Sequence, residues 1–180
     1  RMRDVYGRTI DYLRISVTDR CNYRCVYCMP PEGVTALAHA DVLTYEEIVR
    51  LVAVASRVCG ISRIRLTGGE PLVRNGIAGL VAQIAALPGI KDLAMTTNGS
   101  LFAAQAESLK RAGLRRVNIS LDTLDPERYR SVTGGGSLET VKRSIRLAAA
   151  VCHVEVTTLV IPGKNDSEAE MAAEAQWLAT

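Results

Sequence analysis

The strongest constraint on the fold is a regular alternation of short apolar strands with amphipathic helices. Residues 13–17 alternate apolar and polar side chains with the period of two that a strand requires. We expect strands at residues 13–17, 61–66, 93–97, 117–121 and 154–161, and helices at 45–59, 76–87, 101–112, 137–151 and from 168 onwards. This alternation predicts an α/β fold of βαβ units with a parallel sheet and right-handed crossovers. Periodicity alone leaves a partial barrel and an open doubly wound sheet as alternatives.

Local signals mark where several helices begin and end. Thr44-Tyr45-Glu46-Glu47 has the spacing of a capping box, and Gly60 is a typical helix stop. Asp125-Pro126 predicts an N-cap followed by proline at the first helical position. Ser167-Glu168-Ala169-Glu170 predicts a second capping box. Gly134-Gly135-Gly136 is interpreted as a flexible connection, because the lysine and Ser/Thr of a phosphate-binding loop are absent.

The composition is that of an ordinary soluble chain. Hydrophobic residues make up 48% and charged residues 23% of the 180 residues, and the net charge is +3, so bulk charge argues for neither nucleic acid nor a membrane surface as partner. No apolar stretch approaches the roughly 20 residues of a membrane span. Arg111, Arg115 and Arg116 lie near a helix end and are expected on a solvated face.

Three cysteines lie within one short segment, Cys21, Cys25 and Cys28, with the spacing C-x3-C-x2-C. Three thiolates suit a [4Fe-4S] cluster that needs four ligands, which leaves one iron open for a small chelating molecule. The spacing differs from the two-residue gaps of ferredoxins and lacks the paired arms of a structural zinc site. Clustered thiols without an even disulfide framework favour a reducing cytoplasm.

Other polar segments follow the later strands. Thr67-Gly68-Gly69-Glu70-Pro71 follows the second, residues 96–99 end the third, and residues 120–123 end the fourth. In parallel α/β folds ligands bind at the carboxyl ends of the strands, so these segments and the cysteine loop should meet at one rim. The paired glycines would let a ligand approach the backbone closely, because no Cβ stands in the way.

With this context, the cysteine loop resembles that of the radical S-adenosylmethionine (radical SAM) superfamily. The resemblance implies that Cys21, Cys25 and Cys28 hold a [4Fe-4S] cluster, and that S-adenosylmethionine binds its open iron and is cleaved to a 5′-deoxyadenosyl radical. It also implies that Gly69 and Ser120 touch S-adenosylmethionine and that the backbone near Tyr27 meets its adenine. The implied fold is a partial (β/α)6 barrel. Since only five βα units are visible, residues 1–180 are expected to be an incomplete core domain from a longer protein.

Within that superfamily the chain is similar to the GTP 3′,8-cyclases of molybdenum cofactor synthesis. The similar runs are residues 11–25, 64–74, 96–99 and 118–125. The resemblance implies that GTP is the substrate, with Arg14 and Arg65 gripping the triphosphate and Thr96 as a polar contact. Arginine suits this role because it makes bidentate charged hydrogen bonds. An electron donor of the flavodoxin or ferredoxin type is also implied.

Two features depart from the cyclase pattern. The cyclases usually carry a lysine on the fifth strand where this chain has Glu155, and a carboxylate there would repel a triphosphate. The cyclases also have a C-terminal region with three further cysteines that hold a second, guanine-binding cluster, which lies outside this sequence. Two alternatives stay open: another radical SAM enzyme, such as an activating enzyme or a peptide modifier, and a non-catalytic iron–sulfur or zinc-binding domain.

Overall fold

The computed structural model describes residues 2–180. Its main sheet has five strands, all parallel, in the order β3-β4-β5-β6-β7. They are β3 (Tyr12–Ser16), β4 (Arg63–Thr67), β5 (Asp92–Thr97), β6 (Arg116–Ser120) and β7 (His153–Thr157). A short antiparallel hairpin, which the sequence analysis did not anticipate, precedes them and consists of β1 (Met2–Arg3) and β2 (Thr9–Ile10).

Six α-helices accompany the strands in the described chain: α1 (Tyr45–Val54), α2 (Ile77–Ala85), α3 (Phe102–Ala112), α4 (Pro126–Thr133), α5 (Leu138–Val151) and α6 (Glu168–Leu178). A π-helical turn (Ala55–Cys59) continues α1, and 3-10 helices span His39–Asp41 and Pro71–Val73. Within residues 2–180 we find no helix with the length and apolar character that crossing a membrane demands.

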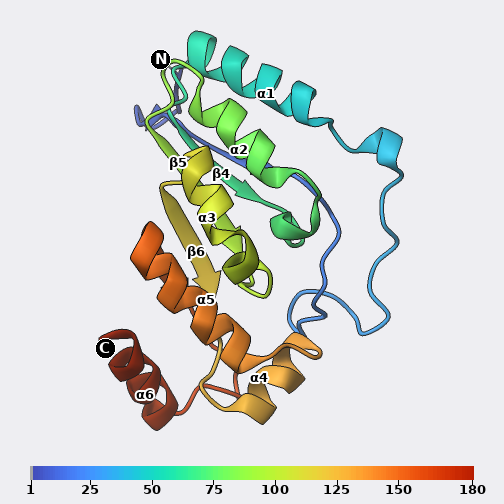
Figure 1. The fold of residues 1–180 in the computed structure, drawn as a ribbon, viewed down its shortest axis with the longest axis vertical. Coiled ribbons are helices and arrows are strands. Elements are labelled where there is room, and N and C mark those ends of the chain that lie inside the picture. The colour runs from blue at the N-terminus through green and yellow to red at the C-terminus, as the bar shows by residue number, and fades with distance from the viewer. Residues whose placement is uncertain (1) are drawn as a thin grey trace.

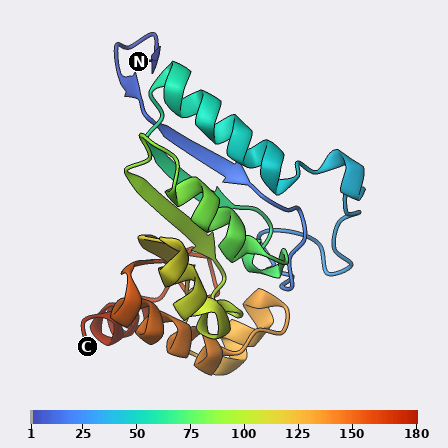
Figure 2. The same cartoon turned by 45° about the horizontal axis from the view of Figure 1, so that its top comes forward.

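The strand order decides between the two architectures that periodicity left open. Each new strand is added beside the previous one, whereas a doubly wound sheet reverses its order partway. Accordingly α1, α2, α3 and α5 lie side by side along one face of the sheet (Figures 1 and 2). This winding confirms the expected partial barrel.

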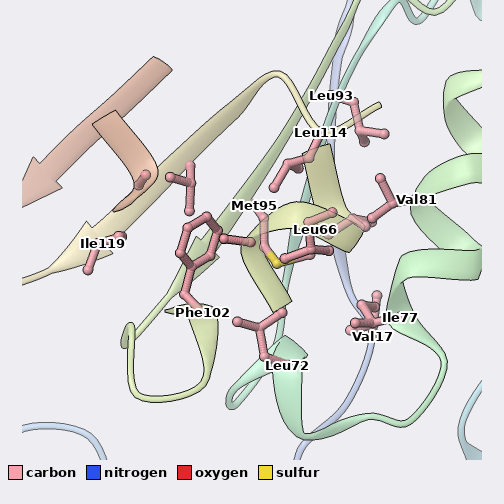
Figure 3. Close-up of a cluster of buried hydrophobic side chains, with 14 of the residues drawn as sticks. Val17, Leu66, Leu72, Ile77, Val81, Leu93, Met95, Phe102, Leu114 and Ile119 are labelled. Carbon is pink, nitrogen blue, oxygen red and sulfur yellow. The ribbon is translucent and has the colours of Figure 1, made fainter. Parts of the chain in front are cut away.

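The hydrophobic core lies between the sheet and these helices. Leu66 and Met95 of neighbouring strands are fully buried there, together with Phe102 of α3 and Val81 of α2 (Figure 3). Since side chains alternate between the two faces of a strand, the opposite face carries the intervening polar residues. This inner face of the partial barrel includes Arg65, Thr96, Asn118 and Glu155.

The local signals predicted most helix boundaries correctly. Thr44 and Glu47 form the reciprocal capping box, Gly60 ends its helix in the left-handed conformation, and the Asp125 side chain accepts a hydrogen bond from the Arg128 amide. The second capping box is only half formed. Ser167 accepts from the Glu170 amide, but the Glu170 carboxylate pairs with Arg128 and accepts from Thr123.

The predicted strand at 154–161 was too long, since β7 ends at Thr157. Beyond that point side chains bind the backbone groups that a sheet would have paired. The Leu159 amide donates to Asp122 Oδ1 (3.0 Å), and the Ile161 amide donates to Asn165 Oδ1 (2.6 Å). The residues after Thr157 therefore turn away from the sheet.

Candidate active site

The cysteine loop leaves the carboxyl end of β3 and lies over the rim of the sheet. The amides of Cys28 and Met29 both donate to the Cys25 carbonyl, at 2.9 and 3.2 Å, which folds the second half of the loop into a tight turn. Cys21 and Cys25 are half-buried and Cys28 is exposed. All three thiols are free in the structure.

The segment after β4 packs against the first part of this loop. The Gly69 amide donates to the Thr18 carbonyl (2.7 Å), and the Glu70 amide donates to the Arg20 carbonyl (2.8 Å). A Cβ on Gly69 would lie 2.3 Å from the Arg20 carbonyl oxygen, and one on Gly68 would lie 2.4 Å from that of Thr18. The glycine pair is therefore required by the close approach of the protein's own cysteine loop, a reason that the sequence analysis did not anticipate.

The second part of the loop rests on the end of α4. The amides of Arg24 and Val26 donate to the carbonyls of Thr133 and Val132, both at 2.9 Å. A Cβ on Gly134 would lie 2.7 Å from the Arg24 carbonyl oxygen, and one on Gly136 would lie 2.8 Å from the Tyr23 hydroxyl. The interpretation of Gly134–Gly136 as a flexible connection was wrong for Gly134 and Gly136, which pack tightly against the cysteine loop, whereas a Cβ on Gly135 would meet nothing within 4 Å.

One cavity of about 210 Å³ brings most of the predicted site residues together. The predicted residues in its lining are Cys21, Cys25, Cys28, Tyr27, Gly69, Ser120, Arg14 and Thr96. Tyr23, Asn98 and Asp122 also line it and belong to the segments that the sequence analysis expected at the rim, whereas Tyr129 and Thr133 were missed. The only sequence signal for Tyr129 and Thr133 is their place on α4, the helix that follows the Asp125-Pro126 N-cap. Arg65 lies outside this lining, but its Nη1 is 3.5 Å from Thr96 Oγ1.

Glu70 ties the ends of two strands together beneath the cavity. This side chain is 1% exposed, and it accepts hydrogen bonds from Thr97 Oγ1 (2.6 Å), the Asn98 amide (2.7 Å) and the Leu72 amide (3.1 Å). Burial raises the pKa of Glu70, and these three donors oppose the rise. The Asn98 side chain in turn donates to Asn22 Oδ1 (2.9 Å), so the network reaches the cysteine loop.

The three cysteines present soft sulfur donors to one cavity. Burial raises the pKa of Cys21 and raises that of Cys25 to about 11, with the Asp122 charge and the neighbouring thiols adding to the rise at Cys25. Any metal bound through these sulfurs would therefore have to displace their protons. Across residues 2–180, no group of three or more His, Cys, Asp or Glu side chains is arranged to hold a single metal ion.

The inner face of the sheet adds charged groups beside the cavity. Arg65 Nη2 lies 3.5 Å from Glu155 Oε2. Arg116 pairs with Asp92 at 2.7 Å and with Glu155 at 3.1 Å. The expectation of a solvated face is confirmed for Arg111 and Arg115, which are exposed, but it was wrong for Arg116. Arg116 begins β6, and its Nε is buried without a hydrogen-bond acceptor.

Comparison with known proteins agrees with this geometry. The family model described as "Radical SAM superfamily" matches residues 15–175. The GTP 3′,8-cyclase of Petrotoga mobilis is 50% identical over 171 residues, covering 94% of this chain and 53% of that protein. That of Peptoclostridium acidaminophilum is 53% identical over 169 residues, covering 93% and 52%. The chain thus spans about half the length of the curated relatives it matches.

A solved structure shows the same fold. The crystal structure of Streptococcus suis SuiB bound to S-adenosylmethionine aligns with a TM-score of 0.73 and 19% identity, over 93% of this chain and 37% of that one. At this identity the likeness concerns the fold alone. The family model matches most of the chain, and on that match the chain belongs to the radical SAM superfamily.

Proposed function

We propose that this chain carries the iron–sulfur and S-adenosylmethionine site of a GTP 3′,8-cyclase. The observation that carries the proposal is the 210 Å³ cavity, in which the three thiols, the glycine segment after β4 and Arg14 meet. The cyclases of P. mobilis and P. acidaminophilum support the choice within the superfamily, since about half of the aligned residues are identical. The names of those two enzymes specify GTP as their substrate.

Cys21, Cys25 and Cys28 would hold a [4Fe-4S] cluster. Thiolates are the donors that such clusters prefer, and three of them leave one iron without a protein ligand. When bound, the cluster supplies the electron that cleaves S-adenosylmethionine to methionine and a 5′-deoxyadenosyl radical. The loop that carries the thiols is fixed on both sides by backbone hydrogen bonds, with Gly69 and Glu70 on one side and with Thr133 and Val132 on the other.

The remaining cavity residues would bind S-adenosylmethionine and the nucleotide. Gly69, Ser120 and the backbone at Tyr27 line the cavity beside the thiols, which suits contacts to the methionine and adenine parts of the cofactor. Arg14 and Thr96 line its inner side, and Arg65 lies next to Thr96. Guanidinium groups bind phosphate oxygens bidentately, so these arginines would orient the triphosphate.

Metal analysis after anaerobic reconstitution tests the cluster. We expect about four iron atoms per chain, and release of 5′-deoxyadenosine with dithionite and S-adenosylmethionine. Cys28→Ser should lose the iron, whereas Cys152→Ser, which changes a cysteine outside the loop, should keep it. One zinc per chain in place of iron would eliminate the radical reaction and favour a structural metal site.

Titration calorimetry with GTP tests the substrate. Arg65→Ala should lose GTP binding and retain 5′-deoxyadenosine release, and the exposed Arg111→Ala should change neither. If the protein releases 5′-deoxyadenosine but does not bind GTP, the result would instead favour assigning the chain to another branch of the radical SAM superfamily.

A further inference from the structure

Two arginines flank a gap on the inner face of the sheet. The register of the parallel strands places Arg65 of β4, Ala94 of β5 and Arg116 of β6 in one row. Ala94 contributes only a methyl group between them, so the two guanidinium groups can be reached by one side chain from the next strand. That side chain is Glu155 of β7, which lies one layer further toward the carboxyl end, beside Asn118.

Glu155 divides its carboxylate between the two arginines. Its Oε1 lies 3.1 Å from Arg116 Nη1, and its Oε2 lies 3.5 Å from Arg65 Nη2. The contact with Arg65 is thus at the outer limit of a hydrogen bond. Arg116 has a second carboxylate partner in Asp92, at 2.7 Å, whereas the only other polar side-chain partner of Arg65 in the described residues is Thr96, at 3.5 Å.

This arrangement leaves hydrogen-bond donors unsatisfied. The Nε atoms of Arg65 and Arg116 are both buried and have no acceptor within residues 2–180. A guanidinium has five N–H donors, and an anion with several oxygens could satisfy those of Arg65 better than Glu155 does. The place taken by the Glu155 carboxylate is therefore one that a phosphate or carboxylate of a ligand could take.

We propose that Glu155 is an intramolecular competitor for the Arg65 anion site and that it determines the specificity of this site. An anionic substrate group binds Arg65 only when the Glu155 carboxylate gives up its contact and remains with Arg116. Because like charges repel, the penalty grows with the charge of the ligand, so Glu155 disfavours highly charged polyphosphates. The inference rests on the proposed function only in that the substrate is anionic.

Calorimetric titration of the full chain with inorganic tripolyphosphate, at constant salt, tests the proposal without guanosine. Glu155→Gln removes the charge and keeps the shape, and we expect it to bind tripolyphosphate roughly tenfold more tightly than the unmodified chain. Asp11→Asn is the matched control, because it removes the same charge from an exposed ion pair with Arg63. Its binding should change twofold or less. Glu155→Ala, checked by circular dichroism, should strengthen binding as well.

A double-mutant cycle shows whether the effect passes through Arg65. In an Arg65→Ala background the gain in tripolyphosphate affinity from Glu155→Gln should disappear, because the guanidinium for which Glu155 and the ligand compete is no longer present. Unchanged or weaker binding by both Glu155 variants, no tripolyphosphate binding by any variant, or a gain that persists without Arg65 would each overturn the proposal. If the gain appears as expected but GTP does not bind, the competition stands and the assignment as a GTP cyclase fails.

Discussion

The hydroxyl of Tyr27 donates a 2.8 Å hydrogen bond to Asp122 Oδ2, across 95 residues of sequence. Tyr27 lies between two of the loop cysteines, and Asp122 follows the end of β6. The other carboxylate oxygen of Asp122 accepts a hydrogen bond from the Leu159 amide at 3.0 Å. The backbone carbonyl of Asp122 accepts one from Asn165 Nδ2 at 2.6 Å. One buried aspartate thus joins the cysteine loop to the segment that follows β7.

We predict that Tyr27→Phe destabilises the chain and weakens S-adenosylmethionine binding. The substitution leaves Asp122 Oδ2 without its donor although Asp122 is 3% exposed, and an unsatisfied buried acceptor costs about 1–3 kcal/mol. Urea unfolding measures the stability, and equilibrium dialysis of the reconstituted protein measures the affinity. Tyr6→Phe, at an exposed position, serves as control. Equal stability and affinity in the two variants would contradict a positioning role for the Tyr27–Asp122 contact.

Gly69→Ala should be strongly destabilising. Its new Cβ would lie 2.3 Å from the Arg20 carbonyl oxygen and 2.6 Å from the carbonyl carbon, so the cysteine loop would have to shift. Overpacking against backbone costs about 3 kcal/mol at the upper end of its usual range. Iron uptake on reconstitution should fall in parallel with the unfolding midpoint.

Gly79→Ala is the matched control for that substitution. Gly79 lies within α2, and a Cβ there meets nothing within 4 Å. Since alanine is the better helix former, this variant should be more stable by about 0.5–1 kcal/mol. If both glycine variants unfold at the same urea concentration, the close approach at Gly69 is not a constraint on the loop.

Glu70→Gln should also lower stability, by about 1–3 kcal/mol at pH 7. Both carboxylate oxygens accept hydrogen bonds, Oε1 from Thr97 and Leu72 and Oε2 from the Asn98 amide. An amide group keeps only one acceptor, so an N–H would face another N–H in either orientation. Thermal unfolding compares this variant with Glu107→Gln on the exposed side of α3. A melting temperature as high as that of the control would show that the network tolerates the mismatch.

The features that the sequence predicted are local ones. The strand period places Ile64 and Leu66 against the helices, and the caps at Thr44 and Asp125 depend on residues within three positions. The rule that ligands bind at the carboxyl ends of parallel strands was enough to bring the cysteines and Gly69 to one rim.

The features that the sequence did not predict depend on contacts between distant segments. Gly136 packs against Tyr23, and Asp122 holds Tyr27, but each pair is about one hundred residues apart in the chain. The ion pairs of Arg116 require the strand register, since Asp92 and Glu155 come from the strands on either side of β6. No local pattern distinguishes such an arginine from one on a solvated face.

The stability of the chain should depend on pH through Glu174 of α6. This side chain is 6% exposed and accepts a hydrogen bond from Thr158. Burial raises the pKa of Glu174, the Thr158 hydroxyl opposes the rise, and the charge of Asp122 adds to it. Between the ordinary pKa of 4.5 and the raised value, the folded state therefore binds more protons than the unfolded state. Stability contributed by this group is full below that window and falls as the pH rises through it.

Glu174→Gln removes this dependence, because the amide stays neutral and can still accept from Thr158. We expect the melting temperature of the variant to match that of the unmodified chain below pH 4.5, and to exceed it increasingly as the pH rises from 4.5 through the raised pKa of Glu174. Glu107→Gln, at an exposed position of α3, should follow the unmodified chain throughout. A difference between Glu174→Gln and the unmodified chain that is constant with pH would mean that packing, and not the ionisation of Glu174, separates the two.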